Sequence, residues 1–198
     1  MENKHTHLVP EELEQLERLS LKDKHMKLQK SLDAFLFCCY AGMRYSDFTN
    51  LSKKNIVDIN QETWLIYKSV KTGTEVRLPL YLLFAGKGIV ILNKYRNNLE
   101  DFFRLRDNSN INKDLIIIAK LAGLSKKISF HTARHTNATL LIYNGVNITT
   151  VQKLLGHKSV KTTQVYTNIM DMTIVHDLEK IKQAALGIKK KTDNSFNK

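Results

Sequence analysis

The sequence predicts a mainly α-helical domain that contains one small three-stranded antiparallel β-sheet. Two patterns support this fold class: apolar residues recur at helical spacing over most of the chain, and β-branched and aromatic runs replace them between residues 55 and 80. The 198 residues are 42% apolar and 25% charged, which suits one substantial core. We therefore expect one domain over residues 1–188. The basic tail 189–198 is charged and unpatterned, which predicts disorder.

Three helices are predicted in the first part of the chain. The segment 9–19 has a proline in its first turn and acidic residues behind it, as helix starts do. The segment 26–43 is a longer, mostly apolar helix that Gly42 can end. A short helix over 46–52 follows, for which Ser46 is the expected N-cap.

The predicted sheet comes next in the chain. Its three strands are runs of β-branched or aromatic residues at 55–60, 63–70 and 74–80. The polar sequences NQE and KTG interrupt them, so the strands should form an antiparallel meander with tight turns.

Helical patterns return after residue 80. The predicted helices cover 81–97, 112–122, 130–144, 148–155, 159–167 and 171–186. The segment 104–112, RLRDNSNIN, predicts a polar loop. Gly145 should end the helix over 130–144.

The charge of the chain indicates an anionic partner. Lysine and arginine number 31 against 19 aspartate and glutamate, which gives a net charge of +12 and a pI near 9.6. Such a field attracts polyanions, of which nucleic acid is the first candidate. We see no apolar run of membrane-spanning length and no signal sequence, so we expect a soluble, cytoplasmic protein. Cys38 and Cys39 are adjacent in an apolar stretch, which predicts buried thiols of a reduced compartment.

Several polar residues stand in unusual places in these elements. Arg44 follows the long apolar helix directly, in AGMRYSD, where a guanidinium needs an anionic partner. Lys71 lies in the predicted hairpin turn, VKTG. His131 and Arg134, in SFHTARHTNATLL, share one face of a helix. Each of these features alone is common in proteins without catalytic meaning.

The stretch LLGHKSVKTTQVY completes the set, because it places Tyr166 nine positions after His157. A lone tyrosine of this kind is usually an ordinary core residue. The complete order Arg, Lys, His-x-x-Arg, Gly-His, Tyr is much more specific. Together with AGMRYSDFTNL and HTARHTNATLL, it resembles the catalytic domain of the tyrosine recombinases, the phage-integrase family, over about residues 8–185.

The resemblance implies the fold of that domain and a nucleophilic role for Tyr166. A phenol has a pKa of about 10, so it needs nearby cations and a proton acceptor to attack phosphorus. By the same resemblance, Arg44 and Arg134 would bind the non-bridging oxygens of the scissile phosphate and stabilise the transition state.

The resemblance also implies roles for the remaining three residues. His131 would accept the tyrosine proton or hydrogen-bond the phosphate, and His157 would add a donor. Lys71 would protonate the departing 5′-oxygen. A 3′-phosphotyrosyl link then conserves the phosphodiester energy, so DNA strands are rejoined without ATP, metal or other cofactor. The implied partners are double-stranded DNA and other protomers, with a tetramer on DNA and a monomer in free solution.

Two departures from the family pattern stand out. Asp47 replaces the usual glutamate three residues after the first arginine, and we expect it to support Arg44. The N-terminal core-binding domain of the family is absent from this chain, so we expect either a catalytic fragment or a protein with a weaker grip on DNA. The segment 172–188 has apolar residues at helical spacing and is expected either to pack on its own domain or to dock on a neighbouring protomer.

Three alternatives remain at this point. His131, His135 and His157 are the candidate ligands of a metal hydrolase, although a threonine replaces the general-base glutamate of HExxH. A DNA-binding relative without strand exchange would not need an attacking phenol. A type IB topoisomerase uses a similar cleavage site and relaxes supercoils as a monomer. The predicted function is site-specific integration or excision of a mobile element, by strand cleavage and rejoining.

Overall fold

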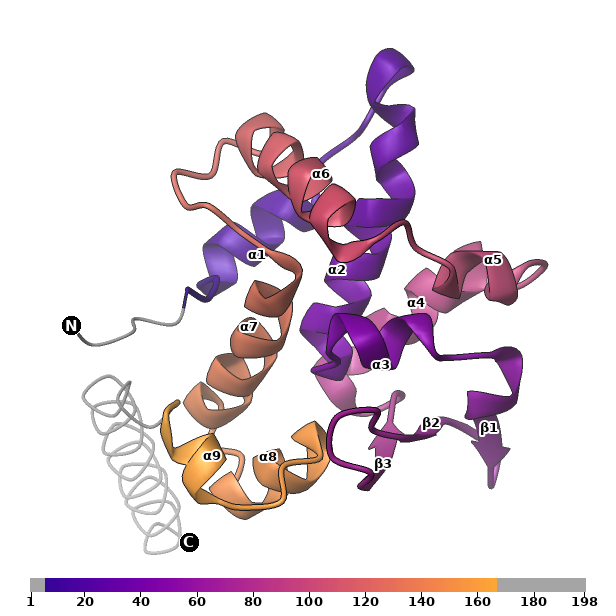
Figure 1. Ribbon diagram of the computed structural model, residues 1–198, viewed down its shortest axis with the longest axis vertical. Coiled ribbons are helices and arrows are strands. Elements are labelled where there is room, and N and C mark those ends of the chain that lie inside the picture. Colours follow the sequence, from indigo (N-terminus) through magenta and orange to yellow (C-terminus); the bar gives the residue numbers. More distant parts are fainter. Residues whose placement is uncertain (1–5, 167–198) are drawn as a thin grey trace, which may run out of the picture.

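The computed structural model describes residues 6–166 and has the predicted fold class, with helices around one three-stranded antiparallel sheet (Figure 1). The α-helices are α1 Pro10–Glu17, α2 Gln29–Ala41, α3 Tyr45–Thr49, α4 Lys87–Lys94, α5 Leu99–Phe103, α6 Asn108–Leu121, α7 Phe130–Tyr143, α8 Ile148–Leu155 and α9 Lys161–Gln164. The strands are β1 Ile56–Ile59, β2 Glu62–Lys68 and β3 Glu75–Pro79, and the 3₁₀ turns are η1 Asp23–Leu28, η2 Lys53–Asn55 and η3 Leu83–Gly86. The predictions for 171–186 and 189–198 lie outside the described residues.

Helix α2 is the centre of the fold. Every residue from Ser31 to Ala41 is buried, because the helix is apolar on all sides and other helices surround it. It packs along α7 and also contacts α1, α4, α5 and α6 (Figure 1). Cys38 and Cys39 are fully buried free thiols, as the sequence predicted.

An aromatic cluster fixes α3 against the core. The ring of Phe48 on α3 meets those of Phe37, Phe102, Phe103 and Phe130, with centroids between 5.3 and 6.1 Å apart. These rings come from α2, α5 and α7. The cluster therefore positions the segment just before α3, which carries Arg44.

The sheet has the predicted order β1–β2–β3, with both pairs antiparallel. Asn60 and Gln61 form the first turn, and both have positive φ, as in the type I′ hairpin turn. The β2–β3 register runs from Trp64 opposite Pro79 to Lys68 opposite Glu75. The turn after Lys68 lies next to α8, which packs on β3 (Figure 1).

Two glycines bring helix ends into very close contact with neighbouring elements. Gly42 ends α2 with a φ of +66°, and a Cβ there would lie 2.6 Å from Oδ1 of Asn137 on α7. Gly156 ends α8 with a φ of +63°, and a Cβ there would lie 2.6 Å from Cγ2 of Val76 on β3. Any side chain at either position would push these elements apart.

Some predicted helix ends are wrong. Arg44, not Ser46, is the N-cap of α3, since the backbone of Arg44 is extended and the helix begins one residue later. Ser46 lies within the first turn, where its carbonyl accepts a hydrogen bond of 2.7 Å from the side chain of Asn50. Helix α9 is shorter than the predicted 159–167, because residues 159 and 160 lead into it as a turn.

The region after the sheet differs most from the prediction. The segment 81–97 is helical only in α4, because Phe84 has a φ of +48° inside the preceding η3 turn. Helix α5 was not predicted. Helix α6 begins inside the segment 104–112 that we expected to be a loop, since the side chain of Asp107 accepts a 3.0 Å hydrogen bond from the N–H of Asn110 and caps it.

Candidate active site

Arg134 is a fully buried cation of the candidate site. It lies on α7, is only 1% exposed, and donates hydrogen bonds to two backbone carbonyls: Nη1 to Gly42 at 2.7 Å and Nη2 to Leu155 at 2.6 Å. These carbonyls belong to the C-terminal ends of α2 and α8, which are negatively polarised and lack intrahelical partners. One guanidinium therefore ties two helix ends to α7 and is itself held in one orientation.

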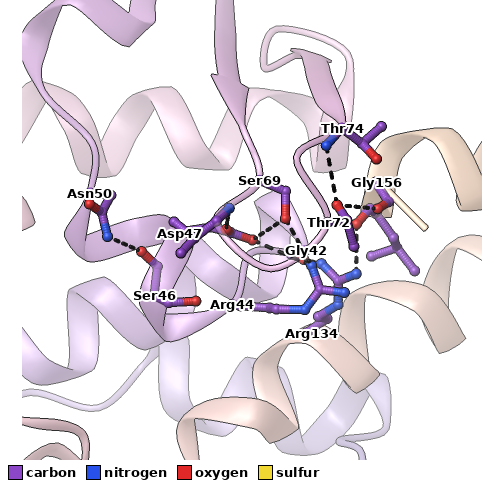
Figure 2. A network of polar contacts seen from close by, with 12 residues as sticks. Gly42, Arg44, Ser46, Asp47, Asn50, Ser69, Thr72, Thr74, Arg134 and Gly156 are labelled. Atoms are coloured by element: carbon purple, nitrogen blue, oxygen red, sulfur yellow. Dashed lines mark hydrogen bonds and ion pairs between the residues drawn. The ribbon is translucent and has the colours of Figure 1, made fainter. Parts of the chain in front are cut away.

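Arg44 meets the anionic partner that its position required. Its Nη1 lies 3.5 Å from Oδ2 of Asp47 and 3.3 Å from the hydroxyl of Ser69 (Figure 2). The buried carboxylate of Asp47 also accepts hydrogen bonds from the Ser69 hydroxyl, at 3.4 Å, and from the backbone N–H of Val70, at 2.8 Å. Asp47 thus joins Arg44 to the end of β2.

The two guanidinium groups share a site that has an excess of positive charge. Figure 2 shows Arg44 and Arg134 approaching each other beneath the β2–β3 turn. The pKa of Arg134 is lowered to about 10, first by burial and then by the positive charge of Arg44, so it stays protonated at neutral pH. Asp47 compensates one of the two charges. A phosphate group between the arginines would compensate the other.

His157 lies in the turn between α8 and α9, directly after Gly156. Its Nδ1 is 2.9 Å from the hydroxyl of the fully buried Thr163, and its backbone exchanges two hydrogen bonds with Gln152. Burial lowers the pKa of His157 to about 4, and the charges of Arg134, Arg44 and Lys71 act in the same direction. The imidazole is therefore neutral at pH 7. Of its two ring nitrogens, Nδ1 is the one that contacts Thr163, and Nε2 is the second.

Tyr166 is buried beside the histidines of α7. Its ring centroid is 5.4 Å from that of His135, whose own ring is 4.4 Å from His131. Burial raises the pKa of the phenol, while the charges of Arg134 and Arg44 oppose that rise. The same two charges act on the buried Tyr67, so what distinguishes Tyr166 is its place beside the histidines of α7.

Lys71 lies in the β2–β3 turn, as predicted, and is exposed. Two backbone hydrogen bonds of 2.8 Å close this turn, from the N–H of Gly73 to Ser69 and from the N–H of Ser69 to Thr74. The hydroxyl of Thr72 donates to the carbonyl of Gly156 at 3.1 Å (Figure 2). The turn is therefore attached to the segment that carries His157.

The structure brings Arg44, Arg134, His157 and Tyr166 together, since the arginine charges act on both His157 and Tyr166, and the charge of Lys71 acts on His157. It connects His131 to this group through the ring of His135, which the sequence analysis considered only as a metal ligand.

Three supporting hydroxyls, those of Ser69, Thr72 and Thr163, were not predicted from the sequence. Each bonds a residue that is distant in sequence or lies across a turn: Ser69 reaches Asp47, Thr72 reaches Gly156, and Thr163 reaches the His157 ring. Nothing in the local sequence distinguishes them from surface hydroxyls.

The metal-hydrolase alternative finds no support in the described part of the chain. Between residues 6 and 166, no three His, Cys, Asp or Glu side chains group closely enough to hold a metal ion. Nδ1 of His157 contacts the Thr163 hydroxyl and not another histidine.

Between residues 6 and 166, no helix is long and apolar enough to cross a bilayer.

Comparison with known proteins gives a consistent family assignment. The model of the phage integrase family matches residues 7–172. A tyrosine recombinase of Pseudothermotoga lettingae is 31% identical over 181 residues, which cover 89% of this chain and 60% of that protein. Tyrosine recombinase XerA of Saccharolobus solfataricus is 34% identical over 134 residues, or 65% of this chain and 42% of that protein. The chain thus spans less than two thirds of the curated relatives it matches.

Solved structures show the same fold. The crystal structure of a XerA recombinase superposes with a TM-score of 0.67 and 24% identity, covering 88% of this chain and 64% of that one. XerH recombinase bound to difH DNA gives a TM-score of 0.66 and 22% identity, with 91% and 52% covered. With the family model matching most of its length, the chain belongs to the phage integrase family and has the fold of a tyrosine recombinase catalytic domain.

Proposed function

We propose that this chain cleaves and rejoins DNA strands by phosphoryl transfer to Tyr166. One observation carries the proposal. The buried carboxylate of Asp47 pairs with Arg44, the charge of Arg44 acts on Arg134, and the charges of both arginines act on the phenol of Tyr166. Such a site favours an added anion next to a nucleophile, as phosphodiester cleavage requires.

The arginines would bind the two non-bridging oxygens of the scissile phosphate. Arg134 needs no reorganisation for this, because two backbone carbonyls already fix its orientation. As the Tyr166 oxygen bonds to phosphorus, its proton must leave. His131 is the proposed acceptor, and neutral His157 is the proposed hydrogen-bond donor to the phosphate through its second ring nitrogen.

Lys71 completes the reaction as the proposed general acid. As the bond from phosphorus to the 5′-oxygen breaks, that oxygen takes a proton from the ammonium of Lys71 and leaves as a hydroxyl. The 3′-phosphate stays linked to Tyr166. When a 5′-hydroxyl of another strand attacks this link, it restores a phosphodiester and releases the phenol, so that the sequence needs no ATP.

The proposed partners are double-stranded DNA and further copies of this chain. Solved relatives include XerH on difH DNA and a lambda integrase tetramer bound to a Holliday junction, which supports assembly of a tetramer on DNA. We propose a monomer in free solution and a role in integration or excision of a mobile element. Docking of the segment 172–188 on a neighbouring protomer belongs to the same proposal, and that segment lies outside the described residues.

Covalent capture of DNA tests the proposal. The chain is incubated with a pool of nicked duplexes of randomised central sequence. The nick makes the fragment released by cleavage short, so that it diffuses away and religation fails. The cleaved strand is labelled at its 5′ end, which stays linked to the protein. We expect labelled DNA linked to protein on a denaturing gel. If no duplex in the pool yields an adduct with the chain, the proposal is wrong.

The same assay separates this mechanism from a metal-dependent hydrolase. None of the proposed steps uses a metal for Lewis acidity or for an activated water. Adduct formation should therefore proceed at the same rate in excess chelator. Loss of the adduct with chelator and its recovery with zinc would instead favour His131, His135 and His157 as ligands.

A further inference from the structure

We infer that Thr72 is a positioning residue for the proposed general acid Lys71, since its hydroxyl holds the β2–β3 turn against the end of α8. The inference rests on the proposed function and adds to it a residue with no charge and no role in the resemblance. Its basis is the hydrogen bond that the Thr72 hydroxyl donates to the carbonyl of Gly156 (Figure 2).

Lys71 lies between two residues that are each attached to a different part of the site. On one side, the backbone N–H of Val70 donates to Asp47, which also pairs with Arg44. On the other side, Thr72 bonds Gly156, the residue before His157. The exposed lysine side chain is flexible, but the backbone from which it extends is fixed at both neighbours.

The Thr72 hydroxyl both donates and accepts a hydrogen bond in this turn. It donates to Gly156 at 3.1 Å and lies 3.4 Å from the backbone N–H of Thr74, from which it accepts. A methyl group in its place could make neither bond. The far side of the contact is also closely packed, because a Cβ at Gly156 would lie 2.6 Å from Cγ2 of Val76 on β3.

The second contact distinguishes this turn from an ordinary hairpin. The bonds that close the turn join Ser69, Gly73 and Thr74 within the hairpin, and they would persist if the hairpin moved as a body. The bonds through Asp47 and Thr72 hold the two neighbours of Lys71 to the part of the site that carries Arg44 and His157, in addition to the contact of Ser69 with Arg44. Loss of the Thr72 bond should thus leave the fold intact and displace the ammonium, and a displacement of about 1 Å can cost about 10²-fold in rate.

A bridging-sulfur substrate isolates this effect. If sulfur replaces the 5′-bridging oxygen, the leaving thiolate needs no proton from Lys71, because a thiol has a pKa of about 8.5. We expect Thr72→Val to slow adduct formation about 10- to 100-fold on an ordinary duplex that the wild type cleaves. On the sulfur-bridged duplex of the same sequence, its rate should be close to that of the wild type.

Two further variants complete the experiment. Thr72→Ser keeps the hydroxyl and should restore the ordinary rate. Thr74→Val is the control, because the backbone of Thr74, and not its hydroxyl, bonds Thr72. The wild type must form an adduct first; its failure to do so would count against the proposed function. With an active wild type, equal slowing of Thr72→Val on both duplexes, or no slowing on either, would overturn the inference.

Discussion

The two cationic regions of the site are built in opposite ways. Arg134 is buried in α7, and backbone carbonyls from two helix ends fix its guanidinium. Lys71 is exposed in a hairpin turn, and only its chain neighbours are attached to the rest of the site. The difference matches the two tasks: charge stabilisation benefits from a rigid group, whereas proton delivery needs a side chain that can reach the leaving oxygen.

Replacement of Arg134 should have the largest effect. Arg134→Ala removes a phosphate ligand and also leaves the carbonyls of Gly42 and Leu155 without their donor. We expect adduct formation to fall at least 10²- to 10³-fold on both oxygen- and sulfur-bridged duplexes, and the free energy of unfolding to fall by about 1–3 kcal/mol. Single-turnover cleavage and urea unfolding measure the two. Rescue by the sulfur substrate would show that Arg134 acts on the leaving group instead.

Lys71→Ala should be the converse case. Because Lys71 is exposed, its loss should leave the unfolding midpoint unchanged. Cleavage of an ordinary duplex should slow by about 10²- to 10⁴-fold, the usual contribution of a general acid. The sulfur-bridged duplex should be cleaved at nearly the wild-type rate. An equal defect on the two duplexes would mean that Lys71 is not the general acid and that the contrast between the two regions is misassigned.

Asp47 connects Arg44 to the turn that carries Lys71, so its replacement should affect phosphate binding and proton delivery, each to a smaller extent. Asp47→Asn removes the charge that pairs with Arg44 and weakens the bond to the N–H of Val70. We expect a loss of about 1.5–3 kcal/mol in unfolding free energy and about tenfold slower cleavage, with partial rescue by sulfur. Asp58→Asn, an exposed change on β1, is the control. Wild-type stability and rate for Asp47→Asn would argue against this connection.

The effect that is smallest at neutral pH concerns His157 and appears only as the pH falls. Its folded-state pKa of about 4 lies below the ordinary value of about 6.5, so between these values the unfolded chain binds a proton that the folded chain does not. Stability from the neutral imidazole is complete above about pH 6.5 and is lost as the pH falls toward 4. Urea unfolding across this window should show a shallower decline for His157→Gln than for the wild type. Parallel curves would contradict a depressed pKa.

The sequence predicted what depends on local pattern. The three strands, α1, α7 and α8 follow from apolar periodicity, and the helix ends at Gly42 and Gly156 follow from the conformations that glycine permits. The start of α6 was missed because the side chain of Asp107 turns a polar stretch into a helix cap. The break at Phe84 was also missed. Its backbone has a positive φ, and its ring contacts Tyr40, which is distant in sequence, so no local pattern marks the break.

The candidate site divides in the same way. The six residues that could be named in the sequence are chemically distinctive and occur in a fixed order. Their supports are backbone carbonyls and hydroxyls, whose partners are set by the packing of distant segments: Arg134 reaches Gly42 across 92 positions, and Thr72 reaches Gly156 across 84. Such contacts leave no local signal, so the structure was needed to find them.

Covalent attachment through one phenol tests the central claim most directly. Tyr67 is a matched control for Tyr166, because it is also a buried tyrosine within reach of both arginine charges, and its hydroxyl has no hydrogen-bond partner among the described residues. We predict that Tyr166→Phe forms no protein-linked DNA on the nicked duplex and still binds it, whereas Tyr67→Phe forms the adduct at nearly the wild-type rate. An adduct that persists in Tyr166→Phe would contradict the account.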